Sequence, residues 1–221
     1  MKHTVEIISV KQITHDVKRF RLTKPAGYRF NPGQATELSI NRPEWTDVLR
    51  PFTFTSLNSE NFLEFTIKIY PDHHGMTEQL DKLGKGDELI INDPRGAIEY
   101  KGPGYFIAGG AGITPFLAIL KQLHQFGQLN GNTLFFANKS KGDIILEDDL
   151  KDMLCSKVTF LISGQTEDPY LNERIGYAFL KENFNDLKQY FYICGPEQMV
   201  NDVNDILLSM GVSPDRLVYE K

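Results

Sequence analysis

Residues 105–115, which read YFIAGGAGITP, contain the pattern that decides the fold of the second half of the chain. Four apolar residues predict a short buried strand, and the glycines that follow them predict a tight turn. Thr114 suits the residue that caps a helix N-terminus, and Pro115 suits the first helical position. A strand that turns directly into a helix begins a βαβ unit, so we expect a parallel sheet in this half of the chain.

Strand-like and helix-like segments continue to alternate after residue 115. Further strands are predicted at residues 133–137, 158–162, 190–194 and 217–219. Helices are predicted at residues 116–126, 146–154, within 174–184 and at 197–210. Because ligands of such sheets bind beyond the carboxyl ends of the strands, the residues just after each strand are the candidates for a site.

The first hundred residues follow a different rhythm, with short strands between clusters of proline and glycine. The strands are predicted at residues 5–10, 19–22, 36–40, 52–56, 62–70 and 88–91, with one helix near 77–83. This spacing predicts an antiparallel barrel or sandwich. The run KGPG at residues 101–104 is the expected joint, so two domains are predicted, at residues 1–101 and 102–221.

The composition of the 221-residue chain is that of an ordinary globular protein, with 41% hydrophobic and 24% charged residues. A formal net charge of -5 disfavours non-specific binding to nucleic acid. No apolar run approaches the ~18 residues of a membrane span, and the first residues lack the apolar stretch of a signal peptide. A cytoplasmic location is therefore expected. His73 and His74 have no third ligand at a suitable spacing, so no metal site is predicted.

Two runs in the first half could bind a phosphorylated, flat cofactor. In RPFT, residues 50–53, strand alternation puts Arg50 and Phe52 on one face. A guanidinium can grip a phosphate and an aromatic ring can stack on a heterocycle, although a solvated arginine beside a core phenylalanine gives the same pattern. In HGMT, residues 74–77, free N–H groups at a helix start can bind an anion, or Thr77 can simply cap an ordinary turn.

Three runs in the second half follow strands and are candidates for a nucleotide site. The glycines at 109–112 let the backbone approach a pyrophosphate, although a plain strand–turn–helix connection has the same composition. In CGP, residues 194–196, Cys194 comes at the end of a predicted strand. It could be a small polarizable group beside a nicotinamide ring, or a buried structural cysteine. The lysines in NKSK, residues 138–141, could bind the 2′-phosphate of NADPH, or they could belong to a solvated loop. The sequence therefore does not choose between NADH and NADPH as the electron donor.

Taken together, these runs resemble the motifs of the ferredoxin–NADP reductase superfamily of flavoprotein reductases. The run at 50–53 resembles its Arg-x-Tyr-Ser/Thr flavin motif, and the run at 74–77 its Gly-x-Ser/Thr pyrophosphate turn. The run at 109–115 resembles its Gly-Gly-Thr-Gly-Ile-Thr-Pro motif, and the run at 194–196 its Cys-Gly-Pro motif. The resemblance covers nearly the whole chain and keeps the four motifs in order. It implies an N-terminal FAD-binding antiparallel β-barrel followed by a C-terminal Rossmann-like α/β domain that binds NADH or NADPH.

The resemblance also implies a set of site residues. Those implied to hold the flavin are Arg50, Pro51, Phe52, Thr53, Ile67, Ile69, Tyr70, Gly75, Met76 and Thr77. Those implied to hold the nicotinamide nucleotide are Gly110, Thr114, Pro115, Cys194, Gly195 and Pro196. Those implied to act at the reacting rings are Thr53, near flavin N5, with Cys194 and Glu220.

The implied activity is transfer of a hydride from NADH or NADPH to FAD and of electrons onward to a separate acceptor protein such as flavodoxin or ferredoxin. The acceptor is expected to be external because two cysteines cannot hold a plant-type iron–sulfur cluster. Three alternatives stay open: the reductase component of a multicomponent oxygenase, a flavin-binding electron-transfer or regulatory subunit with little NAD(P)H activity, and a binding protein without flavin in which Arg50 is a plain surface charge. We expect a monomer.

Three positions differ from the family pattern. Phe52 replaces the usual tyrosine, which keeps the stacking ring and loses one hydroxyl, and Ala111 replaces a threonine. The sequence ends at Lys221, where relatives often have an aromatic residue over the flavin. The flavin is therefore expected to be more open to partners or oxygen.

Overall fold

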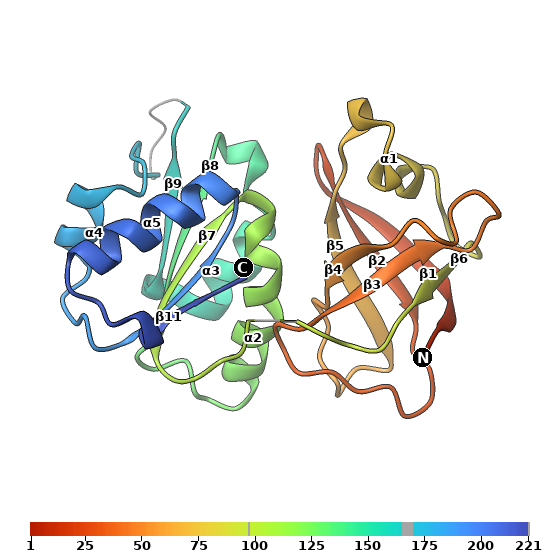
Figure 1. Ribbon diagram of the computed structural model, residues 1–221, viewed down its shortest axis with the longest axis horizontal. Helices are drawn as coiled ribbons and strands as arrows, with labels where there is room; N and C mark the ends of the chain where they lie inside the picture. The colour runs from red at the N-terminus through yellow and green to blue at the C-terminus, as the bar shows by residue number, and fades with distance from the viewer. Residues whose placement is uncertain (97, 165–169, 221) are drawn as a thin grey trace.

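Two β-sheets, one antiparallel and one parallel, organise the computed structural model, which describes residues 1–96, 98–164 and 170–220 (Figure 1). The strand order is β4-β3-β6-β1-β2-β5 in the first sheet and β11-β10-β7-β8-β9 in the second. The last strand of the first sheet ends at Ile91 and the first strand of the second begins at Gly104. The predicted boundary between residues 101 and 102 falls in the connection between these two strands.

The N-terminal domain is the predicted antiparallel barrel. Its strands are β1 (His3–Thr14), β2 (Val17–Thr23), β3 (Ala35–Ile40), β4 (Arg50–Thr53), β5 (Phe62–Lys68) and β6 (Glu88–Ile91). The two edge strands of the sheet approach each other because Phe54, directly after β4, forms an isolated bridge with Phe65 of β5. The same two rings lie 5.0 Å apart between centroids, and Phe54 stacks on Phe30 at 4.2 Å. Closure of the barrel therefore takes place in its aromatic core.

A short 3-10 helix, η1 (Pro71–His73), and the helix α1 (Met76–Asp81) follow β5. Met76 and Leu80 of α1 are buried in the barrel core, which explains why this polar segment is helical: apolar residues four apart lie on one face. The helix lies close to the predicted position at 77–83.

The C-terminal domain alternates parallel strands and helices, as the sequence predicts. Its strands are β7 (Gly104–Gly109), β8 (Thr133–Asn138), β9 (Val158–Ile162), β10 (Tyr190–Cys194) and β11 (Leu217–Tyr219). Its α-helices are α2 (Thr114–Gln125), α3 (Glu147–Leu154), α4 (Tyr177–Asn183) and α5 (Glu197–Ser209). Its 3-10 helices are η2 (Gly110–Ile113), η3 (Lys141–Asp143), η4 (Cys155–Lys157) and η5 (Pro214–Arg216). None of the helices in the described ranges has both the length and the apolar character needed to cross a membrane.

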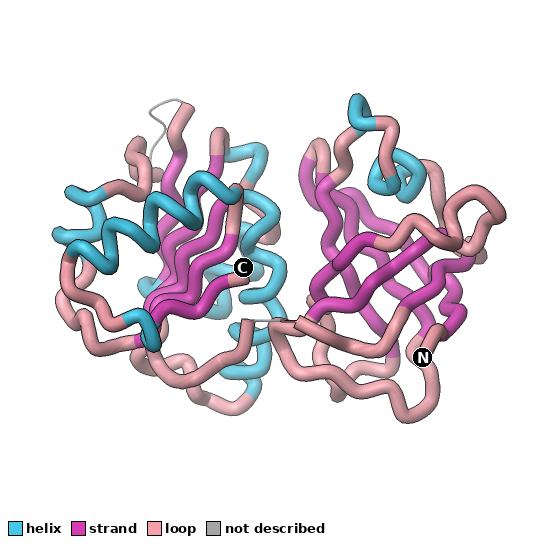
Figure 2. The backbone as a smooth tube through the Cα atoms, viewed as in Figure 1, coloured by secondary structure: helices cyan, strands magenta, loops and turns pink. Residues whose placement is uncertain are grey.

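Helices cover both faces of the parallel sheet (Figure 2). Phe106 of β7 packs in one core cluster with residues of α2 and α3. Its neighbour Ile107 points to the opposite face and packs with residues of α4 and α5. Strands buried on both faces need apolar residues at successive positions, which is why residues 105–108 show no polar alternation.

The order of the parallel strands reverses at β7. The chain runs from β7 to β8 and β9 on one side, then returns to place β10 and β11 on the other side of β7. The carboxyl ends of β7 and β10 therefore flank the switch point of the sheet, where open α/β sheets bind their ligands.

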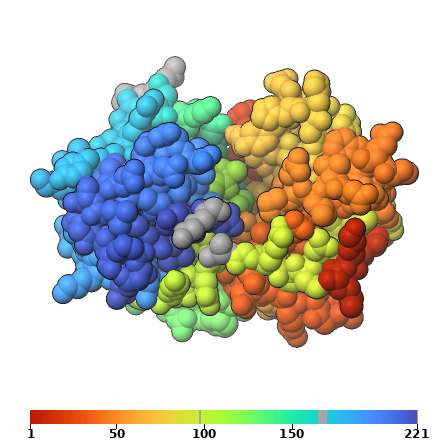
Figure 3. Space-filling view, viewed as in Figure 1, coloured from red at the N-terminus to blue at the C-terminus, as the bar shows by residue number. Residues whose placement is uncertain are grey.

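The connection between the domains is bonded to the parallel sheet. The Tyr192 hydroxyl accepts hydrogen bonds from the backbone N–H groups of Lys101 (2.9 Å) and Gly102 (3.0 Å) and donates to the Gly102 carbonyl (2.7 Å). Burial raises the pKa of Tyr192 to about 12, so this hydroxyl keeps its proton at neutral pH. In the space-filling view the two domains touch, and the surface is hollowed between them towards the upper edge (Figure 3).

Candidate functional site

The turn after β7 packs directly against the end of β10. A methyl group built on Gly112 would lie 2.3 Å from the Cys194 carbonyl oxygen and 2.5 Å from the Gly195 nitrogen. Gly110 has a φ of 51°, the left-handed region that glycine adopts without strain, and faces open space. The runs at 109–115 and 194–196 thus meet at the switch point, because β7 and β10 are neighbours in the sheet.

The prediction that Thr114 caps helix α2 is wrong. The glycine turn is itself the 3-10 helix η2, and Ile113 already has helical backbone angles, so no extended residue precedes α2 to act as a cap. Thr114 is the first residue of α2, Pro115 follows it, and the Thr114 hydroxyl donates to the Ala111 carbonyl at 3.0 Å. The hydroxyl therefore stabilises the turn rather than the free N–H groups at the helix start.

Cys194 ends β10 and is mostly buried. Burial raises the pKa of its thiol to about 12, the Glu220 carboxylate adds to this, and a hydrogen bond from the Gly195 N–H acts in the opposite direction. The thiol is therefore neutral at physiological pH and is not a nucleophilic thiolate. Glu220 is exposed after β11, the neighbour of β10, so the structure brings two of the three predicted reactive residues close together.

Thr53, the third of these residues, lies in the barrel at the end of β4, opposite Ala35 of β3. Arg50, at the start of the same strand, is exposed, and its Nη1 donates to the Leu49 carbonyl at 2.8 Å. Within the described ranges, no carboxylate forms a salt bridge with the Arg50 guanidinium. Phe52 is half-buried and packs against the barrel core, so β4 presents a free cation beside a partly covered ring.

The turn before α1 places Gly75 in extended backbone as the residue before the helix, and His74 in the left-handed region with a φ of 47°. Met76 is buried in the barrel core. Thr77 does not cap the helix, because its hydroxyl oxygen accepts a hydrogen bond from the Tyr70 N–H at 3.3 Å. The alternative interpretation of Thr77 as a simple cap is therefore wrong.

The three residues predicted to line the cofactor at the end of β5 and just after it have different surroundings. The side chains of Ile67 and Ile69 are buried in the barrel core, so only their backbone groups are available to a ligand. Tyr70 is partly exposed, and its ring stacks on His73 at 5.1 Å between centroids. The roles assigned to these residues stay predictions.

Asn138, at the carboxyl end of β8, is a feature that the sequence did not single out alone. Its side chain is buried, and within the described ranges neither its amide nitrogen nor its oxygen has a hydrogen-bond partner. Buried amides are normally satisfied, so an unpaired one beside the switch point fits a site that binds a polar molecule. In the following loop the Ser140 hydroxyl donates to the Asp143 carboxylate at 2.7 Å, which places an acid among the lysines.

Comparison with known proteins assigns each domain to a family. The oxidoreductase FAD-binding domain matches residues 4–100 and the oxidoreductase NAD-binding domain matches residues 106–205. The chain is 26% identical to the reductase component of propane 2-monooxygenase from Rhodococcus jostii, over 97% of this chain and 62% of that protein. It is 30% identical to NADH-cytochrome b5 reductase 1 from Bos taurus, over 99% of this chain and 83% of that protein.

A solved structure shows the same fold. The ferredoxin NADP+ reductase from Neisseria gonorrhoeae with bound FAD and NADP superimposes with a TM-score of 0.88 at 22% identity, over 99% of this chain and 98% of that one. Together these matches confirm the predicted fold and the predicted cofactor classes: the barrel is an FAD-binding domain and the parallel sheet an NAD-binding domain. The chain belongs to the ferredoxin–NADP reductase superfamily.

Proposed function

We propose that this chain is a reductase that takes a hydride from NADH or NADPH onto FAD and passes electrons to a separate redox protein. The observation that carries the proposal is the packing of the turn after β7 against the Cys194 end of β10, in a domain that contacts the FAD-binding barrel. FAD, when bound, supplies the conversion between two-electron and one-electron chemistry. The protein supplies binding, orientation and charge.

On the flavin side, the exposed Arg50 guanidinium, which bonds only to the neighbouring Leu49 carbonyl in the described ranges, would donate hydrogen bonds to diphosphate oxygens through its planar fork. The half-buried ring of Phe52 would pack against the flavin, and Thr53 would lie near its N5 atom. Backbone groups of Gly75, Met76 and Thr77 would bind the diphosphate.

On the nicotinamide side, Gly110 leaves room for a ligand to approach the backbone, so the glycine turn at 109–112 would face the phosphates. Thr114 and Pro115 would hold this turn at the start of α2 without donating N–H groups, since the Thr114 N–H bonds to the Ala111 carbonyl and proline has none. The neutral thiol of Cys194, held by the Gly195 and Pro196 turn, would give the nicotinamide a polarizable surface without a competing charge. A carboxylate at Glu220 would stabilise the positive charge that a nicotinamide ring gains when it loses a hydride.

The acceptor is proposed to be a small electron-carrier protein such as flavodoxin or ferredoxin. A second candidate, the reductase component of a multicomponent oxygenase, is supported by the match of 97% of this chain to such a component in Rhodococcus jostii. The chain spans 62% of that relative's length, and the two cysteines among these 221 residues are too few for a plant-type cluster, so the acceptor centre would lie outside these residues. A monomer in the cytoplasm remains our proposal.

The test begins with FAD reconstitution of the purified chain and its anaerobic mixing with NADH and, separately, NADPH. We expect stoichiometric FAD binding and bleaching of the flavin by at least one nucleotide, with the faster one identifying the preferred donor. Reduced protein is then mixed with flavodoxin, ferredoxin and cytochrome b5 to find the acceptor that reoxidises it. A chain that binds no FAD contradicts the proposal, and a chain whose flavin stays oxidised with both nucleotides is the non-catalytic subunit instead.

A further inference from the structure

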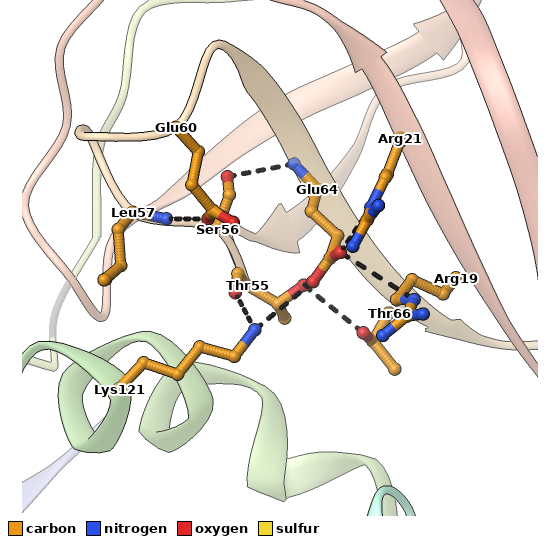
Figure 4. Close-up of polar contacts among 9 residues, drawn as sticks. All are labelled: Arg19, Arg21, Thr55, Ser56, Leu57, Glu60, Glu64, Thr66 and Lys121. Carbon is orange, nitrogen blue, oxygen red and sulfur yellow. Dashed lines mark hydrogen bonds and ion pairs between the residues drawn. The ribbon is translucent and has the colours of Figure 1, made fainter. Parts of the chain in front are cut away.

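A buried carboxylate lies where the two domains meet. Glu64 of β5 has a side chain only 2% exposed, yet cations surround it (Figure 4). Its Oε2 accepts from Arg21 Nε at 3.0 Å and lies 3.7 Å from Arg19 Nε, and the Thr55 hydroxyl donates to its Oε1 at 3.2 Å. Because these partners all belong to the barrel, the carboxylate is satisfied within its own domain.

One further partner comes from the other domain. Lys121 extends from α2 towards β5, where its Nζ donates to the Thr55 carbonyl at 2.7 Å and to Glu64 Oε1 at 3.3 Å (Figure 4). The lysine side chain is 31% exposed, so water screens this ion pair less than a fully exposed one. Hydrogen bonds from one ammonium group to a carbonyl and a carboxylate are directional, whereas apolar contacts are not.

The two ends of this contact are attached to the two halves of the site. Lys121 lies seven residues after Thr114 on α2, which is about two helical turns from the nucleotide-binding turn. Thr55 lies two residues after Thr53, the residue proposed to lie near flavin N5. A short rigid path therefore joins the flavin-side strand to the nicotinamide-side helix.

Apolar contacts close the same interface without fixing its register. Val17, next to the β1–β2 turn of the barrel, is buried in the core cluster of the α/β domain, together with Ile98 from the connection. A polar approach at the β1–β2 turn is beyond hydrogen-bond distance, since His15 Nε2 lies 3.8 Å from Asp143 Oδ1 and the histidine side chain is exposed. Hydrophobic burial holds the domains together, and a directional contact is needed to set the distance between them.

We propose that Lys121 is a positioning residue for hydride transfer. Its contact with Thr55 and Glu64 holds α2 at the separation from β4 at which the nicotinamide carbon and flavin N5 react. In that step one hydride, carrying two electrons, leaves the reduced nicotinamide, which is oxidised, and FAD is reduced as it also takes a proton from solvent. Such reactions need the reacting atoms about 3–3.5 Å apart, and the inference rests on the proposed function.

The variant Lys121→Met tests this inference, because Glu64 keeps Arg21, Arg19 and Thr55 when the lysine is lost. Anaerobic stopped-flow should show the limiting rate of flavin reduction falling roughly 10- to 100-fold, the effect of a small misplacement of reacting groups. The FAD dissociation constant and the nucleotide concentration that gives half the limiting rate should stay unchanged. The long-wavelength charge-transfer absorbance of the nucleotide complex should weaken.

The matched control is Lys157→Met, since Lys157 Nζ bonds to Asn130 Oδ1 at 2.9 Å within the α/β domain. This variant should reduce its flavin at the unaltered rate. Lys121→Arg, which restores a cation at the contact, should recover most of the rate. If Lys121→Met fails to fold, Lys121→Gln, which keeps a donor for the Thr55 carbonyl, should show the same loss of rate to a smaller extent.

The outcomes separate this inference from the proposed function. If the unaltered chain binds FAD but is not reduced by either nucleotide, the proposed function fails. If the unaltered chain is reduced and Lys121→Met is reduced equally fast, Lys121 does not position the rings. If Lys121→Met instead loses FAD affinity or thermal stability far beyond Lys157→Met while its limiting rate is kept, the lysine is structural and the inference is wrong.

Discussion

Gly112 and Cys194 are joined so closely that a methyl group on the glycine would lie 2.3 Å from the cysteine carbonyl oxygen. A real Cβ does not occupy such a position, so any side chain must push the turn after β7 away from the end of β10. The turn after β7 and the end of β10, which flank the switch point of the parallel sheet, can therefore pack this closely only because residue 112 has no side chain.

The variant Gly112→Ala should therefore lose both stability and nucleotide binding. Overpacking of this kind costs about 1–3 kcal/mol of unfolding free energy, measured by urea denaturation. The affinity for NADH or NADPH should fall because the turn and Cys194 no longer line one site. Gly84→Ala is the control, since a Cβ there meets nothing within 4 Å, and its unfolding free energy should change by less than about 0.5 kcal/mol. An unaltered nucleotide affinity in Gly112→Ala contradicts the site.

Arg50→Ala should weaken FAD binding without destabilising the barrel. The guanidinium bonds to the neighbouring Leu49 carbonyl, so its loss removes little from the folded protein. A charge-assisted hydrogen bond to a phosphate contributes about 1.5–3 kcal/mol, which corresponds to roughly a 10- to 150-fold higher FAD dissociation constant. Flavin fluorescence titration measures the constant. Arg42→Ala, which removes an exposed arginine paired with Asp87, should leave it unchanged.

Unfolding free energy should fall steeply in alkaline solution. Burial raises the pKa of Tyr28 and Tyr192 from 10.0 to about 12, and that of Cys194 from 9.0 to about 12. Between these values the unfolded chain has released the protons and the folded chain still holds them, so stability is fully present below about pH 9 and is lost as the pH rises towards 12. Urea denaturation from pH 8 to pH 11 measures the slope. Cys194→Ala should make the slope shallower, and an equally steep slope in that variant contradicts the assignment.

The periodicity of the sequence predicted a parallel α/β second half and an antiparallel barrel or sandwich in the first half, and the family resemblance selected the barrel. A short run of apolar residues bounded by glycines, such as 105–108, favours a strand covered on both faces. In the first half, short strand-like segments alternate with turns. The sequence also predicted that the residues just after the strands lie at the ligand-binding edge of the sheet, and the structure shows that β7 and β10 are neighbours there. These features depend on local residue order, which a sequence displays directly.

Side-chain roles that depend on the exact backbone conformation or on distant residues were not predictable in this way. Threonine is a residue type that often caps helices, but the 3-10 helix before Thr114 means that no residue at this helix start has the extended backbone that a cap needs. Glu64 interrupts the apolar run of β5, which was a visible signal, yet its partner Lys121 lies 57 residues further along the chain. Nothing in the local pattern of α2 distinguishes that lysine from a solvated one.

The joint between the domains gives a last prediction. One atom, the Tyr192 hydroxyl oxygen, makes three hydrogen bonds to the backbone of Lys101 and Gly102. Tyr192→Phe leaves those partly buried backbone groups without this partner, so the unfolding free energy should fall by about 1–3 kcal/mol. Tyr190→Phe is the matched control on the same strand, because the Tyr190 hydroxyl makes no hydrogen bond to the residues that the structure describes. Both variants keep the aromatic ring, so equal losses measured by urea denaturation would show that the three bonds of the Tyr192 hydroxyl add no stability, which contradicts the prediction.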